Sequence, residues 1–253
     1  MKSRLLRGAL LLVAALLLLS SCSVPALTLK DGAYLDKKTN VSYLPAPSCY
    51  QAIGYAKDSA VARIKLKEMD DLVLYPIDGM EGNKWLCNED YQVFYADSET
   101  LPELWEMDVT KVCVNRTVNQ SYTVATILKK EDIAALINAY QNGPSFEQSD
   151  MDEGLVFEKY DLVFEASALR YCLTYWKFEK EVLIYETIAD PNSFTPTYPN
   201  VRVTTEEYHY TRDGQAMVEH LAVYHFGTEI LYNRETGLCY PVEGTVADYL
   251  PEA

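Results

Sequence analysis

The sequence lacks the short motifs that mark the common active sites. It contains no GxSxG, no P-loop, no dinucleotide-binding GxGxxG and no HExxH. Histidine is scarce, since only His209, His220 and His225 are present. His220 and His225 are separated by an odd number of positions, so on one strand they would face opposite sides and could not share a metal. We therefore predict no catalytic residue, no metal site and no cofactor.

Positive charge is also in short supply. The chain of 253 residues carries 22 Lys and Arg against 37 Asp and Glu, which gives a formal charge of −15. Nucleic acids and anionic lipid surfaces are bound through Lys and Arg that neutralise phosphate. The acidic balance therefore excludes nucleic acid as an expected partner.

Cysteine pairs in redox or zinc-binding spacing are missing. No CxxC occurs, and no Cys and His residues are spaced as zinc ligands. Cysteine is nevertheless present at six positions. If Cys22 is modified as argued below, an odd number remains, and the sequence does not decide which of them pair. Aromatic or aliphatic neighbours favour small buried hydrophobic residues over catalytic thiols at most of these positions. The remaining cysteines are Cys49, Cys87, Cys113, Cys172 and Cys239.

Long hydrophobic runs are absent except at the N-terminus. There, three basic residues precede an apolar run from Ala9 to Leu19, which is too short for a bilayer-spanning helix of ~20 residues. The run suits a signal peptide. It ends in Leu19-Ser20-Ser21-Cys22, which resembles the bacterial lipobox. In proteins of that kind the cysteine is linked to diacylglycerol and becomes the first residue after cleavage.

The lipobox resemblance implies a lipid anchor, and with it a location. We expect a signal peptide over 1–21, a tether over 22–30 and a globular region over 31–253, which is either one domain or two halves, 31–118 and 119–253. The lipidation site is Cys22, and two or more acyl chains such as palmitate would hold the chain stably on the extracytoplasmic face of the cell membrane. The alternative is an ordinary secretory signal with an accidental cysteine.

One stretch predicts a helix, over about 130–142. Ile133, Leu136, Ile137 and Tyr140 fall at i, i+3, i+4 and i+7, so they form one apolar stripe. Leu136 and Ile137 are both expected to point into a sheet. Gly143 and Pro144 predict the end of the helix, with Gly in a left-handed cap.

Short runs rich in Val, Ile, Tyr and Thr predict strands on both sides of that helix. Two turns share one pattern, at Asp36–Asn40 and Asn233–Gly237, where Asn40 and Gly237 supply a left-handed residue between two strands. Arg212–Gln215 predicts a further hairpin turn. The expected fold class is α+β, a mostly antiparallel sheet with one principal helix packed on it and an N-terminal signal helix.

The lipobox and the β-rich pattern resemble uncharacterised secreted or lipid-anchored proteins of gut-type Firmicutes. The residues that carry the resemblance in the mature chain are fold patterns rather than catalytic signatures, so it implies no chemistry. They are Asp36–Pro47, Trp85–Cys87, Val93–Ala96, Thr126–Ile133 and Asn233–Pro241.

Two classes of function stay open. Aromatic side chains on an exposed sheet would suit a non-enzymatic binding module at the cell surface, with a surface protein or a glycan as ligand. The alternative is an envelope-associated hydrolase that uses a pair of carboxylates in one cleft. We expect the first, although Tyr is also favoured in strands for packing alone. The candidate aromatic residues are Tyr171, Tyr175, Trp176, Tyr208 and Tyr210.

Overall fold

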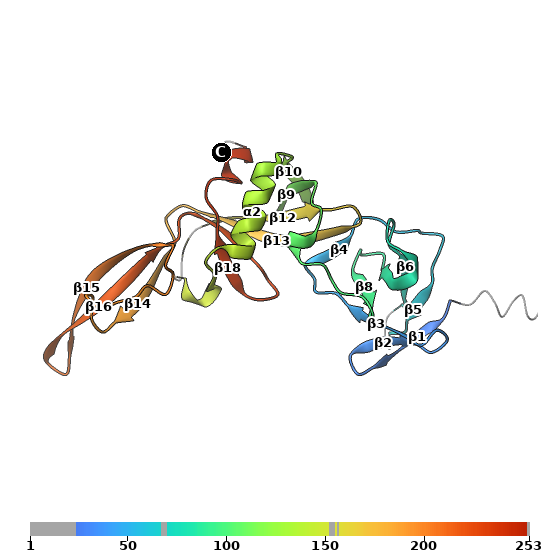
Figure 1. The fold of residues 1–253 in the computed structure, drawn as a ribbon, viewed down its shortest axis with the longest axis horizontal. Helices are drawn as coiled ribbons and strands as arrows, with labels where there is room; N and C mark the ends of the chain where they lie inside the picture. The colour runs from blue at the N-terminus through green and yellow to red at the C-terminus, as the bar shows by residue number, and fades with distance from the viewer. Residues whose placement is uncertain (1–23, 67–69, 152–154, 156, 252–253) are drawn as a thin grey trace, which may run out of the picture. The chain divides into compact units, whose positions relative to one another are not determined.

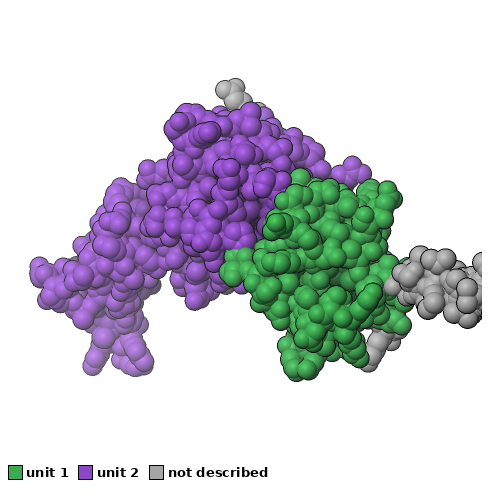
Figure 2. All heavy atoms as spheres, turned by 45° about the vertical axis from the view of Figure 1, so that its right-hand side comes forward, with its two compact units in different colours: residues 1–46, 52–101 green, residues 47–51, 102–253 purple. Residues whose placement is uncertain are grey.

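The computed structural model describes residues 24–66, 70–151, 155 and 157–251. The chain divides into two compact units, which Figure 2 shows in different colours. Unit 1 comprises residues 1–46 and 52–101, and unit 2 comprises residues 47–51 and 102–253. The predicted signal peptide and Cys22 lie outside the described residues, as do residues 152–154.

Unit 1 is a small closed barrel of seven strands, in the order β1-β2-β3-β8-β7-β6-β5. All neighbouring strands are antiparallel except β1 and β5, which pair in parallel and close the barrel. Alternate side chains point inward and form its core, to which Leu74, Leu86 and Phe94 contribute. The strands are β1 (Ala26–Lys30), β2 (Ala33–Asp36), β3 (Val41–Pro45), β5 (Ala62–Ile64), β6 (Leu72–Pro76), β7 (Trp85–Cys87) and β8 (Val93–Ala96).

Unit 2 contains an eight-stranded sheet in the order β10-β9-β12-β13-β17-β18-β11, with β4 also paired to β13 (Figure 1). Along β12 the side chains from Tyr160 onward alternate between a buried and a more polar face, whereas β13 is buried on both faces over Leu173–Trp176. The strands are β4 (Tyr50–Ala52), β9 (Lys111–Thr117), β10 (Ser121–Ile127), β11 (Phe146–Glu147), β12 (Phe157–Glu165), β13 (Leu169–Phe178), β17 (Glu229–Tyr232) and β18 (Leu238–Pro241).

The helix α2 (Lys130–Asn142) lies where the apolar stripe predicts it. Ile133, Leu136 and Tyr140 are buried, but Ile137 is only half-buried, so the expectation that Ile137 faces fully inward is wrong. The expected left-handed cap is also wrong, because Gly143 has a φ of −71°. Glycine is needed there for a different reason: a Cβ atom would lie 2.3 Å from the carbonyl oxygen of Ala139.

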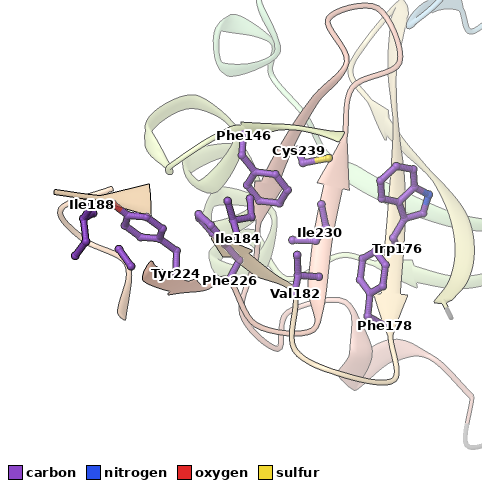
Figure 3. Packing of buried hydrophobic residues seen from close by; sticks show 11 residues of the cluster. Phe146, Trp176, Phe178, Val182, Ile184, Ile188, Tyr224, Phe226, Ile230 and Cys239 are labelled. Carbon is purple, nitrogen blue, oxygen red and sulfur yellow. The ribbon is translucent and has the colours of Figure 1, made fainter. Parts of the chain in front are cut away.

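A second sheet of unit 2 has three strands in the order β14-β16-β15. They are β14 (Leu183–Ile188), β15 (Arg202–Arg212) and β16 (Gln215–His225). One face of this sheet joins a buried cluster with residues of β11, β13, β17 and β18, and Figure 3 shows Ile184 close to Phe146, with Tyr224 beside Ile188 farther along the sheet. This cluster ties the base of the three-stranded sheet to the rest of unit 2.

The three predicted turns are confirmed. Asn40 and Gly237 have φ values of 59° and 74°, in the left-handed region. Both turns are closed by the first residue of the pattern, since the amides of Asn40 and Gly237 donate to the carbonyl oxygens of Asp36 and Asn233. Arg212 pairs with Gln215 across a two-residue turn.

The predicted fold class, α+β, is wrong. Among the described residues α2 is the one α-helix, beside eighteen strands and the short 3₁₀ helices η1 (Gly82–Lys84), η2 (Leu104–Glu106), η3 (Gln148–Asp150) and η4 (Ala247–Tyr249). The chain is mostly β, with a closed barrel that the α+β description omits. The expected signal helix lies outside the described residues, and no described helix is long and apolar enough to cross a membrane.

Apart from the segment 47–51, which belongs to unit 2, the chain passes from unit 1 to unit 2 between Leu101 and Pro102. The alternative division into 31–118 and 119–253 would fall in the turn between β9 and β10. Those two strands pair from Thr117 and Ser121 onward, so the chain on both sides of that turn belongs to one sheet.

Candidate functional site

The three-stranded sheet of unit 2 presents one face that the buried cluster does not use. In an antiparallel sheet, directly opposite side chains lie on the same face. The register pairs Val203 and Ile184 with the buried Tyr224, which defines the core face. We call the opposite one the outer face. On β15 and β16 it carries Arg202, Thr204, Glu206, Tyr208, Tyr210, Met217, Glu219, Leu221, Val223 and His225.

Two tyrosines near the tip of the hairpin form what we call the aromatic strip, Tyr208 and Tyr210. Their rings lie 5.9 Å apart between centroids, with an interplanar angle of 27°. The Tyr210 hydroxyl donates to Glu219 Oε1 at 2.7 Å, which fixes its ring across the hairpin. Tyr208 is 57% exposed and the neighbouring Met217 is 39% exposed, so large apolar side chains meet solvent here.

The other three aromatic candidates are not exposed. Tyr171, Tyr175 and Trp176 of β13 are buried, and Tyr171 bonds the hydroxyl of Tyr140 on α2 at 2.8 Å. The expectation that they would share an exposed platform with Tyr208 and Tyr210 is therefore wrong. β13 is flanked by β12 and β17, whereas β15 is an edge strand, and this difference decides the exposure.

A polar cluster occupies the base of the outer face. His225 Nδ1 lies 2.9 Å from Glu181 Oε2, and His225 Nε2 lies 3.1 Å from Thr204 Oγ1. Arg202 Nη2 lies 2.7 Å from the same Nδ1 and 3.0 Å from Glu181 Oε2. The cluster borders a hollow of about 560 Å³ that α2 and the segment after β18 also line.

The order hydroxyl, imidazole and carboxylate is that of a nucleophile with its base and orienting acid. Sequence reasoning missed it, because Thr204 and Glu181 come from separate segments. A working triad needs Nδ1 to donate to the carboxylate, so that Nε2 is free to accept the hydroxyl proton. Here the guanidinium of Arg202 competes for Nδ1 as a donor. The cluster is therefore better suited to holding Glu181, in the segment before β14, against β15 and β16 than to activating Thr204.

Electrostatics agree with that role. The hydrogen bond from His225, and then the charges of His225 and Arg202, hold the pKa of Glu181 below its usual value. A carboxylate with a lowered pKa is an anion that is paired, and it is unsuited to donating a proton as a general acid.

The remaining histidines lie on the core face, toward the tip of the sheet. His209 Nε2 lies 3.4 Å and His220 Nδ1 lies 3.9 Å from the carboxylate of Glu207. The predicted separation of His220 and His225 onto opposite faces is confirmed by the register. No group of three or more potential metal ligands exists among the described side chains.

None of the five described cysteines forms a disulfide. Burial raises the pKa of Cys49 to about 11 and the pKa values of Cys87, Cys172 and Cys239 to about 12. Burial also raises the pKa of Cys113. These thiols are protonated at neutral pH and are poor nucleophiles.

A smaller hollow, of about 220 Å³, lies against the eight-stranded sheet. Its charged groups already have partners: Arg234 Nη2 lies 2.6 Å from Asp161 Oδ1, and Glu235 Oε1 accepts from the amide of Ser48 at 2.9 Å. Arg234 Nε also donates to Thr174 Oγ1 at 2.8 Å. The hollow thus contains two carboxylates, but both serve to hold the β17–β18 hairpin in place.

Comparison with known proteins adds no candidate. The chain matches no protein-family model, no curated protein and no solved structure. The site therefore has to be argued from its geometry alone.

Proposed function

We propose that the protein is a lipid-anchored extracytoplasmic protein, of the kind of the uncharacterised lipoproteins it resembles, and that it acts as a non-enzymatic interaction module. The lipobox at Leu19–Cys22 supports the anchor. The exposed part of the outer face near the hairpin tip, at Tyr208 and Met217, supports the interaction, and it is the observation that carries the proposal. The partner is a protein rather than a nucleic acid, given the formal charge of −15.

The anchor depends on one thiol. If Cys22 receives diacylglycerol, Cys22→Ser should leave an uncleaved and unacylated precursor. Mass spectrometry of the membrane fraction would show the wild-type chain beginning at an acylated Cys22 and the variant retaining residues 1–21. An unmodified Cys22 in the mature wild-type protein would contradict the anchor. The variant should fold normally, because the described β units start beyond this position.

The outer face suits a protein partner for two reasons. Exposed Tyr and Met side chains are enriched where proteins bind one another, and Met217 and Tyr208 lie on the same face. The ring of Tyr210 is also held by its bond to Glu219 Oε1, so less conformational freedom is lost when a partner covers the aromatic strip.

Photo-crosslinking in the membranes of the source bacterium tests this surface. A benzophenone amino acid at position 208 should form adducts with a protein. The same probe at Tyr122, which is 52% exposed on β10, is the matched control and should form none. Absence of adducts at 208, or equal adducts at both positions, would refute the interaction module. Mass spectrometry of the adduct identifies the partner.

The alternative, a hydrolase with a carboxylate pair, has weaker support. Such an enzyme needs one carboxylic acid with a raised pKa. Among the described carboxylates with a displaced pKa, every displacement is downward: Glu99, Asp132, Glu181 and Asp190. Hydrogen bonds from Lys84, Tyr249, His225 and the amide of Asn192, respectively, are the main causes.

A further inference from the structure

The outer edge of β15 is an open hydrogen-bonding edge. β15 runs from Arg202 to Arg212 and pairs with β16 along its whole length without a register shift. In the described part of the chain no other strand pairs with it. All 11 of its residues are exposed or half-exposed. The edge therefore offers a row of unpaired backbone groups to another strand.

β15 also lacks the features that protect natural edge strands. Such strands are usually short, bulged, or interrupted by Lys or Pro. β15 has 11 residues, RVTTEEYHYTR, with neither Lys nor Pro, and it is rich in β-branched and aromatic residues. The opposite edge of the same sheet, β14, has only 6 residues. The sheet thus leaves one long edge open, and it is the edge beside the aromatic strip.

The hairpin turn decides which backbone groups face outward. Arg212 and Gln215 flank a two-residue turn whose residues Asp213 and Gly214 have φ values of 52° and 78°. The pair that flanks such a turn is a hydrogen-bonded pair, and bonded pairs alternate along the ladder. Even-numbered residues of β15 therefore bond to β16, and the odd-numbered residues from Val203 to Thr211 direct their N–H and C=O groups to the open edge.

We propose that this edge pairs antiparallel with β15 of a second copy of the chain, which makes the partner at the proposed interaction surface the protein itself. The strand carries its own charge complement, because Arg202 and Arg212 at its ends balance Glu206 and Glu207 at its middle. The edge is locally neutral although the chain has a formal charge of −15. Physiological salt screens the remaining repulsion beyond about 8 Å.

The pairing register follows from the alternation of the backbone groups along β15 and from the charges of its side chains. The odd-numbered residues, whose N–H and C=O groups point to the open edge, must lie opposite odd-numbered residues of the second copy. The two-fold axis of the pairing therefore passes through one residue position of β15 and not between two positions. Centring on Glu206 or Glu207 would place like charges directly opposite, which is destabilising. Centring on Tyr208 places Glu207 opposite His209 of the second copy, and centring on His209 places Glu206 opposite Arg212 of the second copy. Registers centred nearer either end pair fewer residues, or only as many as the His209 register without its opposite charges, so the centre is Tyr208 or His209.

Pairing would join the two outer faces. Directly opposite residues share a face, so the sheet becomes six-stranded and the two aromatic strips lie beside each other across the two-fold axis. A single strand pair is a small interface. The proposal therefore rests on the proposed anchor at Cys22, which confines copies to one membrane plane and raises their effective concentration.

Single cysteine substitutions from 206 to 210, in the full chain in native membranes, test the register. Opposite Cα atoms in an antiparallel pair lie about 4.5–5.5 Å apart, within the range that a disulfide spans. Under mild oxidation, Tyr208→Cys or His209→Cys should give at least tenfold more disulfide-linked dimer than Glu206→Cys. The latter is the matched control, because its equivalents would be displaced by about 14 Å or more along the strands. The wild-type chain reports any background from its own thiols.

A proline substitution separates edge pairing from misfolding. Glu207→Pro removes an outward N–H and leaves the β15–β16 bonds intact, a position at which edge strands tolerate proline. Added to the best cross-linking variant, it should reduce the linked dimer at least tenfold with an unchanged melting temperature. Equal linking at all five positions, a maximum at 206, 207 or 210, or linking that survives Glu207→Pro at an unchanged melting temperature would overturn the proposal. If position 208 photo-crosslinks only to a different protein, the interaction module stands and self-pairing is refuted.

Discussion

Leu136→Ala should lower the free energy of unfolding of unit 2 by about 2–5 kcal/mol, the range for a fully buried leucine. Leu136 is 0% exposed at the middle of the stripe that α2 directs inward, with Ile133 and Tyr140 on either side. Removing its side chain loses the transfer free energy of the apolar atoms and leaves a cavity, because Tyr140 is held by hydrogen bonds to Tyr171 and Asn233 and cannot move in to fill it.

Ile137→Ala is the matched control on the same helix. Ile137 is only half-buried, so less apolar surface is exposed to water when its side chain is removed, and the loss should be clearly smaller than for Leu136→Ala. Chemical denaturation followed by tryptophan fluorescence measures both, with the buried Trp176 as the reporter of unit 2. If Ile137→Ala lowered the free energy of unfolding as much as Leu136→Ala or more, Ile137 would point fully into the sheet, as the sequence predicts.

Local signals in the sequence predicted the local structure well. The helix bounds follow from a stripe and a stop within one stretch, and the turns follow from residues that tolerate the left-handed region. Asp36 shows how complete such a signal is: its carboxylate accepts from the amide of Lys38 and from the hydroxyl of Thr39, at 2.8 Å each. Everything needed to form this turn lies within a few residues.

The barrel of unit 1 could not be predicted in the same way. Its closure depends on the parallel pairing of Ala26 and Leu27 with Arg63 and Ile64, which are far apart in the chain. Its strands β5 and β7 have three residues each, too few for alternation to be visible. Tertiary pairing, and not periodicity, makes these segments strands.

The site was predictable only in part, for a related reason. Tyr171 and Tyr208 both occur in runs typical of strands, but one is buried and the other is 57% exposed. Whether a strand is central or at an edge depends on which other strands join it, and no local pattern records that. The contact between Thr204 and His225 likewise arises only when two strands pair in one register.

The second large effect is expected at Glu229, a carboxylate that is 6% exposed at the start of β17. It accepts three hydrogen bonds. The Tyr175 hydroxyl donates to Oε2 at 2.6 Å, and the amides of Gly244 and Ala247 donate at 3.1 and 3.4 Å. Glu229 therefore holds the segment after β18 against the sheet. Burial, and then the bond to Glu229, raises the pKa of Tyr175, so its phenol stays protonated as a donor.

Glu229→Ala should lower the free energy of unfolding of unit 2 by about 2–4 kcal/mol, because the buried Tyr175 hydroxyl and two part-buried amides lose their acceptor together. Tyr175→Phe should cost less, about 1–3 kcal/mol, since the carboxylate keeps both amides. The loss of free energy of unfolding for Glu229→Gln should lie between the losses for Tyr175→Phe and Glu229→Ala. The reason is that an amide group offers one acceptor oxygen and turns its NH₂ toward a donor. Equilibrium denaturation at neutral pH measures all three. The segment 242–247 could instead be held by apolar contacts, such as those of Val246, which is 0% exposed. In that case Glu229→Ala would lower the free energy of unfolding no more than Tyr175→Phe does, and the role of this carboxylate would be refuted.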